Sequence, residues 1–291
     1  MASPPISASI VVPTYREAPN IEPLTNRIFA ATTHAGIEIE LIVVDDDSQD
    51  GTEQIVERLR ERYPIRLVVR RGDRGLSGAV LAGFRQARFD RLVVLDADLQ
   101  HPPEMIPQLL ARLDQGDCDF VIGTRYGGAG SVTADWPIAR RLGSAIATLL
   151  ARPLARLSDP LSGFFALHRR TWEQAAPLDP IGYKIALELF VKGGCRHPGE
   201  VPITFVSRAA GASKASFAEG RRYLRHLWRL YRFRFPRLTE TIRIAFIVGA
   251  ALFILFFACR SAHSRETPRR GDSTVPTRTS ILSLEQPRHE H

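Results

Sequence analysis

Two stretches decide the fold: ELIVVDDDSQDGT at residues 40–52 and RLVVLDADLQHPPE at residues 91–104. In each, an apolar run without polar alternation ends in acids and is followed by a helix-length stretch, which is typical of a strand buried on both faces. Similar runs occur elsewhere in the first half of the chain. We expect strands at residues 7–13, 40–45, 65–70, 91–96 and 120–123, and helices near residues 21–35, 52–63, 78–87 and 103–113.

This alternation predicts an α/β domain built on a mostly parallel, Rossmann-like sheet flanked by helices. Residues 136–220 are less regular and are expected to extend the same domain, so we assign a single domain to residues 1–220. The elements expected there are a helix at 137–157, a turn and strand at 159–168, a helix at 184–192 and a strand at 198–205. Ligands of such sheets bind beyond the carboxyl ends of the strands.

The composition excludes several classes of protein. A chain of 291 residues, 44% of them hydrophobic, can bury a large core without disulfides. Three scattered cysteines without a CxxC pattern exclude a disulfide framework and a structural zinc site. No HExxH, GxSxG or GxxxxGK[ST] pattern occurs, which disfavours zinc proteases, α/β-hydrolases and P-loop enzymes. No signal peptide is recognisable at the start, so the bulk of the protein is expected in the cytoplasm.

The net charge of +8 resides in the last quarter of the chain. Residues 221–241 interleave arginines with Leu, Trp, Tyr and Phe at helical spacing, which predicts a basic amphipathic helix at a membrane surface rather than a nucleic-acid site. Residues 244–259 carry no charge and would form a helix about 24 Å long against a hydrocarbon core of about 30 Å. We therefore expect one marginal transmembrane segment at 242–259 and a disordered tail at 260–291.

The acids after the predicted strand at 91–96 suggest a metal site. Asp96 and Asp98, followed by the amide of Gln100, form a set of hard oxygen ligands suited to Mg²⁺ or Mn²⁺. The alternative is that such acids only cap the next helix. A second acidic cluster after the strand at 40–45 favours a ligand site, because parallel strands bring their carboxyl ends to one edge.

Further polar residues follow the other predicted strands. Tyr15 and Glu17 follow the first, where they could flank a base and reach a ribose, and Asp46 could accept hydrogen bonds from the same nucleoside. Arg125 follows the fifth strand, where it could meet a diphosphate. Arg208 and Lys214 lie six residues apart and could form a two-cation phosphate clamp, the alternative being solvated surface charge.

Taken in order, the motifs PTYxE, DDxSxDGT, GLSGA, DADLQHPPE, GTRY, DPxSGF, GYK and EVPIxF…R…GxSK resemble the family 2 glycosyltransferases of the dolichol-phosphate (polyprenol-phosphate) mannose synthase type. The resemblance covers residues 10–216. It implies a GT-A fold, a nucleotide-sugar donor, a divalent metal and a lipid-phosphate acceptor. The stretch at 243–251 also looks like the start of a membrane domain of the GtrA type, which is fused to some of these enzymes.

The resemblance assigns roles to individual positions. The residues implied to bind the nucleotide sugar are Pro13, Tyr15, Glu17, Val44, Asp46, Asp96, Ala97, Arg125, Arg208 and Lys214. The implied metal ligands are Asp96, Asp98 and Gln100, the implied catalytic residues are Asp98, Arg125, Ser144, Arg208 and Lys214, and the sugar and acceptor end is assigned to Asp159, Ser162, Gly163 and Glu188.

The chain departs from the family at two positions. The family's arginine beside Ser144 is missing, which leaves Arg140 or Arg141 as its replacement, and Arg16 stands where the family usually has Asn.

The expected reaction is inverting transfer of a hexose, mannose from GDP-mannose, onto a polyprenyl monophosphate. The second pKa of such a phosphate is about 6, so it is already an anion near neutral pH and needs no general base. The alternatives are another donor such as UDP-glucose, a nucleotidyltransferase, or a non-catalytic scaffold that binds nucleotide sugars. The protein is expected to be membrane-associated, with the catalytic domain on the cytoplasmic face and no nucleic-acid partner.

Overall fold

The computed structural model describes residues 6–72, 74–126, 130–132, 138–179, 181–182, 184–206 and 217–263, and divides into two compact units, Met1–Thr239 and Glu240–His291. A seven-stranded sheet forms the centre of the first unit, in the order β3-β2-β1-β4-β7-β5-β8. The strands are β1 (Ser7–Thr14), β2 (Glu38–Asp45), β3 (Ile65–Val69), β4 (Arg91–Val94), β5 (Phe120–Thr124), β7 (Phe165–His168) and β8 (Pro198–Pro202).

Six of the seven strands share one direction. Each of β1, β2, β3 and β4 is parallel to its neighbour among these four, β5 is parallel to β8, and only β7 runs antiparallel, between β4 and β5. The carboxyl ends of six strands therefore meet at one edge of the sheet. The register places Pro13 opposite Val44 and Val11 opposite Val94, so the ends of β1, β2 and β4 lie at nearly the same level.

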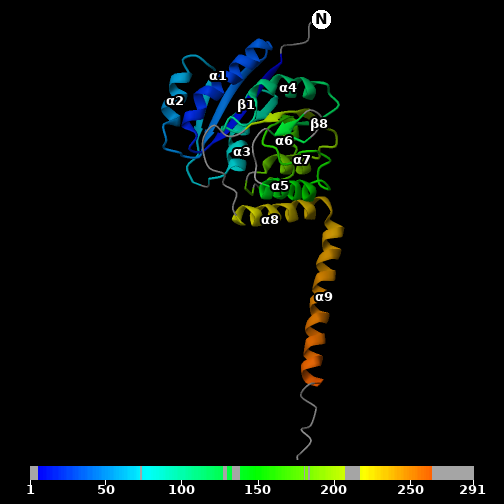
Figure 1. Ribbon diagram of the computed structural model, residues 1–291. Coiled ribbons are helices and arrows are strands. Elements are labelled where there is room, and N and C mark those ends of the chain that lie inside the picture. The colour runs from blue at the N-terminus through cyan, green and yellow to red at the C-terminus, as the bar shows by residue number, and fades with distance from the viewer. Residues whose placement is uncertain are drawn as a thin grey trace, which may run out of the picture. The chain divides into compact units, whose positions relative to one another are not determined.

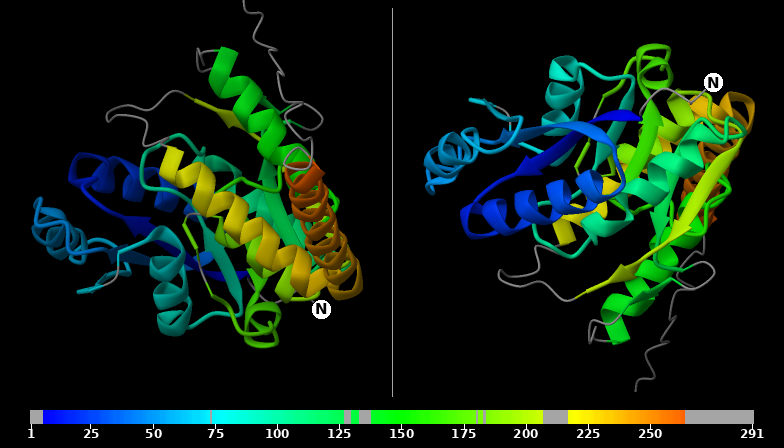
Figure 2. Two further views of the ribbon diagram at one scale, coloured as in Figure 1. Left: turned by 90° about the horizontal axis from the view of Figure 1, so that it is seen from below. Right: turned by 90° about the horizontal axis from the view of Figure 1, so that it is seen from above.

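Helices cover both faces of the sheet, as Figures 1 and 2 show. One face packs against α1 (Ala18–His34), α2 (Thr52–Leu59) and α4 (Ile106–Asp114), the last preceded by the 3₁₀ turn η1 (Pro103–Met105). The other packs against α3 (Leu76–Gln86), α5 (Ile138–Ala151), α7 (Ile185–Lys192) and α8 (Phe217–Arg234). Alternate residues of β1 serve the two cores: Ile10 and Val12 face the first, and Val11 the second. The expected three-layer α/β architecture is confirmed.

Most of the predicted elements occur within a few residues of their expected positions. The helix expected at 137–157 ends earlier, at Ala151, and the strand expected at 198–205 divides into β8 and β9 (Thr204–Phe205). β9 pairs with β6 (Ser131–Val132) in a separate two-stranded sheet. The sequence did not indicate α6 (Arg169–Glu173) or the antiparallel direction of β7.

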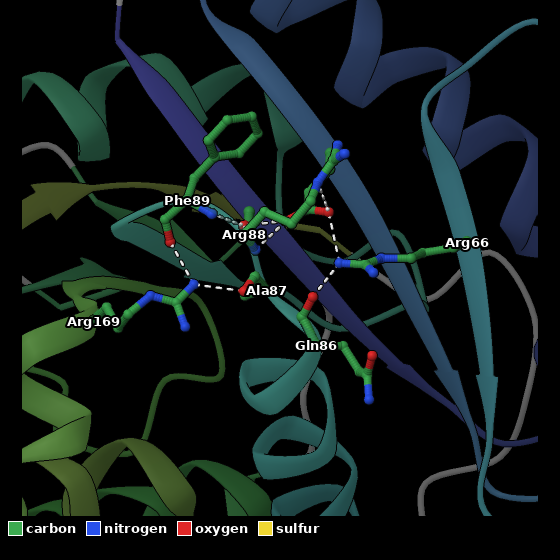
Figure 3. Close-up of polar contacts among 8 residues, drawn as sticks. Arg66, Gln86, Ala87, Arg88, Phe89 and Arg169 are labelled. Atoms are coloured by element: carbon green, nitrogen blue, oxygen red, sulfur yellow. Dashed lines mark hydrogen bonds and ion pairs between the residues drawn. The ribbon is translucent and has the colours of Figure 1, made fainter.

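The amino edge of the sheet is closed by a polar network around Glu40, which is 2% exposed. Its Oε1 accepts hydrogen bonds from Ser9 Oγ at 2.6 Å and the Arg88 backbone N–H at 2.5 Å, and its Oε2 accepts from Arg66 at 2.7 Å and Arg88 Nε at 3.0 Å. Arg66 also donates to the carbonyl of Gln86 (Figure 3). These bonds attach the connection between α3 and β4 to β1 and β2, at the edge opposite the strand-end acids.

The helix predicted at 221–241 is interrupted. α8 ends at Arg234 and α9 (Pro236–His263) begins at Pro236, since proline fits the first turn of a helix but not its interior. Leu227 and Leu230 of α8 are buried in the core of the first unit, and the hydroxyls of Tyr223 and Tyr231 donate to the carbonyls of Ala147 and Leu150 on α5. α8 is therefore packed against α5.

The membrane segment predicted at 242–259 lies within α9. Among the residues that the structure describes, no helix is long and apolar enough to cross a bilayer. The predicted transmembrane segment is thus not confirmed. Residues 260–263 of the tail predicted to be disordered belong to α9, and the rest of that tail lies outside the described residues.

Candidate functional site at the carboxyl edge of the sheet

The turn after β2 is held by its own acids. The Asp45 carboxylate accepts hydrogen bonds from the backbone N–H of Ser48 at 2.7 Å and from its hydroxyl at 2.5 Å. Asp50 accepts from the backbone N–H of Ala18 at 3.0 Å and from Thr52 Oγ1 at 2.7 Å. Burial disfavours the charged form of Asp50, but these hydrogen bonds outweigh it and hold its pKa below the usual value. Asp45 and Asp50 therefore serve the local structure.

Asp46 connects the end of β2 to the loop before α3. It is 4% exposed; its Oδ1 lies 2.6 Å from Arg70 Nη1, and its Oδ2 accepts the backbone N–H of Gly75 at 2.7 Å. Arg74 donates from Nε to the Asp46 carbonyl at 3.1 Å and from Nη1 to the Tyr15 hydroxyl at 3.0 Å. The structure thus brings the predicted residues Tyr15 and Asp46 together and adds two cations beside them.

Arg70 and Arg74 were not among the candidate residues. Their signal was the basic stretch RRGDR at residues 70–74, immediately before the GLSG motif. The guanidinium of Arg74 lies 4.8 Å from the centroid of the Tyr15 ring, within the range of a cation–π contact. A polyanion entering at this edge would meet both arginines.

Backbone strain gathers at the same edge. Among the described residues, the non-glycine residues with left-handed φ are Arg16, Asp47, Gln49 and Leu99, at +60°, +54°, +53° and +61°. All four lie in the turns that follow β1, β2 and β4. Such conformations cost of order 1 kcal/mol or more each and persist where the surroundings fix them, commonly at ligand sites.

A cavity of about 500 Å³ opens beside the turn after β2, lined by Asp45, Asp47, Gln49, Asp50, Gly51, Thr52, Glu53, Gln54 and Val69.

The turn after β4 carries the predicted metal ligands. Asp98 is 6% exposed and accepts the backbone N–H of Gln100 at 3.2 Å, and the side-chain amide of Gln100 donates to the Val206 carbonyl at 2.8 Å. The Asp96 side chain is 30% exposed, with His101 Nδ1 lying 3.6 Å from its Oδ2. Within the described residues no group of three or more His, Cys, Asp and Glu side chains is placed to hold a metal.

Arg125, after β5, forms a buried bidentate ion pair with Asp159. Nε lies 2.6 Å from Oδ2 and Nη2 lies 2.9 Å from Oδ1, with Asp159 fully buried. Burial disfavours the charge on Arg125, but hydrogen bonding to Asp159 outweighs it and raises the pKa of the guanidinium. The next residue, Tyr126, places its hydroxyl 3.0 Å from that of Ser144 on α5. The predicted residues Arg125 and Asp159 are therefore paired, and Ser144 contacts the residue next to Arg125.

Lys184, the lysine of the GYK motif, joins this group, although no role was predicted for it. Its Nζ donates to the Leu161 carbonyl at 3.3 Å. Burial, and then the charge of Arg125, lower its pKa to about 8, against the opposing charges of Asp159, Asp96 and Glu219. The sequence feature that could have drawn attention to it is the rarity of lysine, which accounts for only three of the 39 basic residues.

The remaining candidates lie in different surroundings. Ser162 is buried, and its hydroxyl accepts the backbone N–H of Phe164 at 3.3 Å. Glu188 is buried in α7, where it pairs with Lys192 at 2.6 Å and accepts the backbone N–H of Asp179 at 2.9 Å, so its hydrogen bonds do not involve the strand-end acids.

Pro13, Val44 and Ala97 are buried at the ends of β1, β2 and β4. Glu17 accepts the side-chain amide of Asn20 at 2.7 Å, beside the turn after β1. Arg208 and Lys214 lie outside the described residues, so the two-cation clamp remains a prediction.

The fold and this edge define a GT-A-like α/β protein. The model of the family "Glycosyl transferase family 2" matches residues 9–174. The chain belongs to glycosyltransferase family 2 and is a glycosyltransferase.

Relatives and solved structures agree with this assignment. The chain is 43% identical over 259 residues to a dolichol-phosphate mannosyltransferase of Mycosarcoma maydis, covering 86% of each chain. It is 46% identical over 239 residues to the protein of the same name from Saccharomyces cerevisiae, covering 79% of this chain and 89% of the relative. It also resembles the structure of glucosyl-3-phosphoglycerate synthase from Mycobacterium tuberculosis in complex with Mn²⁺, UDP and glucosyl-3-phosphoglycerate, with a TM-score of 0.58, 22% identity and coverage of 79% and 80%. At that identity the likeness concerns the fold alone.

Proposed function

We propose that the chain transfers mannose from GDP-mannose to the phosphate of dolichol or a related polyprenol, with inversion at the sugar. The names of the relatives support the sugar and the acceptor. The observation that carries the proposal is the meeting of acids and cations at one sheet edge. Since β1 alone separates β2 from β4, the turns bearing Asp46 and Asp96 lie about 10 Å apart, a span that a nucleotide sugar can bridge.

The residues after β4 fit a divalent cation. Asp96 and Asp98 supply two carboxylates on one short turn, and Mg²⁺ or Mn²⁺ in nucleotide sites is commonly held by one or two carboxylates plus phosphate oxygens. A third acidic side chain is therefore not required. When bound, the cation would neutralise the negative charge of the diphosphate leaving group. Gln100, whose amide nitrogen donates to the Val206 carbonyl, is proposed as a further ligand through its amide oxygen.

The chemistry expected of the remaining residues is electrostatic. The acceptor phosphate oxygen attacks the anomeric carbon as an anion, the bond from that carbon to the diphosphate breaks, and the nucleoside diphosphate leaves. Fixed cations at the diphosphate lower the barrier without transferring a proton. Arg70, Arg74 and Lys184 are suited to this role, together with Arg208 and Lys214 as proposed from the sequence. Arg125 is held by Asp159, which fixes its direction.

We also propose that the first unit lies against a membrane, with its catalytic site on the cytoplasmic side. α5 exposes an apolar stripe at helical spacing, with Leu142 60%, Ile146 50% and Leu149 63% exposed, and α8 exposes Trp228 among its arginines. Apolar stripes beside arginines suit an interfacial position on anionic lipids. Ser144, which contacts Tyr126 next to Arg125, lies on α5 itself. A lipid phosphate at this surface would therefore be close to the site.

A donor panel tests the proposed function. The purified full chain is incubated with dolichyl phosphate in liposomes, Mg²⁺ or Mn²⁺, and labelled GDP-mannose, UDP-glucose or other nucleotide sugars. We expect a mannosyl phospholipid and GDP as products, with GDP-mannose preferred. Preference for another donor would change the sugar but keep the reaction. A nucleotidyltransferase would instead release pyrophosphate when supplied with GTP and mannose 1-phosphate, and donor binding without transfer would indicate a scaffold.

A further inference from the structure

The Asp96 carboxylate is enclosed on one side by the backbone of Gly163. A Cβ atom built on Gly163 would lie 2.8 Å from Asp96 Oδ2, closer than Cβ contacts occur in proteins, and 3.1 Å from Oδ1, which is also tight. Asp159, in the same segment, is fixed by its bidentate pair with Arg125, and its carbonyl accepts the backbone N–H of Ser162 at 3.3 Å. The Asp96 carboxylate can take its present position only because residue 163 has no side chain.

A second contact comes from His101, which is 2% exposed. Its ring lies between Phe164 and Phe205, with centroid distances of 5.6 and 5.2 Å, so that packing fixes its orientation. Nδ1 lies 3.6 Å from Asp96 Oδ2 and has no hydrogen-bond partner within the described structure. Contacts of this kind are often slightly long in ligand-free sites and shorten when the ligand binds.

The contact between His101 and Asp96 is of the kind that orients a metal ligand. Carboxylates that bind a cation are themselves commonly oriented by neighbouring donors, and removing such a donor typically lowers metal affinity 10- to 100-fold. When Nδ1 carries the ring proton, it can donate to Asp96 Oδ2 from a position that the two aromatic contacts fix.

We propose that Gly163 and His101 are positioning residues that set the direction of the Asp96 carboxylate for cation binding. This inference rests on the proposed function, because it takes Asp96 as a cation ligand. It gives Gly163 a role different from the sugar and acceptor contact expected from the sequence. It also explains why the DADLQH and DPLSGF segments have to meet.

The two residues should respond differently to substitution. In Gly163→Ala, the atoms that must move belong to the short Asp96 side chain, so the carboxylate turns away while the fold is kept. His101→Phe keeps the aromatic packing and removes the N–H, whereas His101→Asn places an amide nitrogen near the position of Nδ1. We therefore expect Gly163→Ala and His101→Phe to be defective, and His101→Asn to regain part of the affinity.

The test measures Mn²⁺ binding by the full chain in the presence of GDP, by electron paramagnetic resonance, with thermal unfolding recorded for every variant. Gly220→Ala is the matched glycine control, because a Cβ at Gly220 meets nothing within 4 Å, and His168→Phe is the histidine control, because His168 pairs with Arg91 at the opposite edge of the sheet. We expect at least a tenfold loss of Mn²⁺ affinity in Gly163→Ala and His101→Phe, and less than a twofold change in both controls.

The Asp96→Ala variant distinguishes a failure of the positioning role from a failure of the proposed metal site. If Asp96→Ala loses Mn²⁺ while Gly163→Ala and His101→Phe bind it within twofold of the unmodified chain, the positioning role is wrong and the proposed function stands. If Asp96→Ala itself binds Mn²⁺ normally, the proposed metal site is wrong. Should His101→Phe fail to fold, the comparison of Gly163→Ala with Gly220→Ala decides the question.

Discussion

At the scale of single residues, Asp98 is the most sensitive position of the proposed site. It is 6% exposed and accepts the backbone N–H of Gln100. Asp98→Asn keeps the volume and this hydrogen bond but removes the charge. If a cation bound there supplies about 4 kcal/mol to the transition state, transfer should fall about 10³-fold while the melting temperature changes little. Steady-state transfer rates and thermal unfolding measure both quantities, and near-normal turnover would reject the metal assignment.

Lys184 makes a prediction about pH. Its pKa is lowered to about 8, through burial and the charge of Arg125, while Asp159, Asp96 and Glu219 act in the opposite direction. Between about pH 8 and its unfolded value of 10.5, the unfolded chain binds more protons at this position than the folded one. The free energy of unfolding contributed by Lys184 should therefore rise with pH across this window and stay level above it.

Lys184→Met removes this dependence. Urea unfolding of both chains from pH 7 to 10.5 gives the difference in their free energies of unfolding, in which other titrating groups largely cancel. We expect the original chain to gain stability relative to Lys184→Met as the pH rises from 8. A constant difference between the two chains would show that the pKa of Lys184 is not lowered.

At the scale of elements, the network around Glu40 should contribute to the stability of the fold but not to turnover. Glu40→Ala removes the acceptor of Ser9, Arg66 and Arg88 at the amino edge, far along the strands from the proposed site. Arg66 and Arg88 are partly exposed to water, but the buried Ser9 hydroxyl loses its acceptor, so we expect the free energy of unfolding to fall by about 2 kcal/mol. The turnover of the folded fraction should be unchanged.

The exposed pair formed by Glu57 and Arg60 provides the control, because Glu57→Ala should cost less than about 0.5 kcal/mol. Denaturant unfolding and transfer assays at low temperature distinguish the outcomes. An equal effect of the two substitutions on stability, or a loss of turnover in folded Glu40→Ala, would contradict this view of the amino edge.

The apolar stripe of α5 predicts how the protein meets lipid. Ile146→Asp replaces a half-exposed apolar side chain, whose burial is worth about 1.5–3 kcal/mol, with a charge. Binding to anionic liposomes should weaken about tenfold or more, as measured by co-sedimentation. Thr33→Asp adds the same charge to an exposed position of α1 and should have little effect. Equal binding by both variants would show that α5 does not contact the bilayer.

At the scale of the whole molecule, the sequence predicted the features that neighbouring residues determine. It missed the features that depend on contacts between residues distant in sequence. Apolar runs such as that ending in Asp45 predict strands because burial on both faces demands apolar residues throughout. The parallel direction of these strands then predicts that the acids at their ends meet at one edge of the sheet. The antiparallel β7 was missed because four residues do not reveal their direction. Lys184 was missed for a similar reason: its neighbours Arg125 and Asp159 are distant in sequence and meet it only in the folded chain.

Two other outcomes have local physical causes. The single helix expected at 221–241 is broken at Pro236, where the missing backbone N–H and the fixed φ favour a new helix start. Glu188, expected at the acceptor end, pairs with Lys192 one helical turn away in α7, and its contact with the acceptor stays a prediction. A motif fixes which residues are present, whereas the face they occupy depends on the element that carries them.

A structure of the full chain with GDP and Mn²⁺ would show whether the proposed site binds both. We predict the metal between the diphosphate and the carboxylates of Asp96 and Asp98, with the nucleoside toward Tyr15 and Asp46. A nucleotide bound away from these turns, or a metal held without either Asp96 or Asp98, would contradict this prediction.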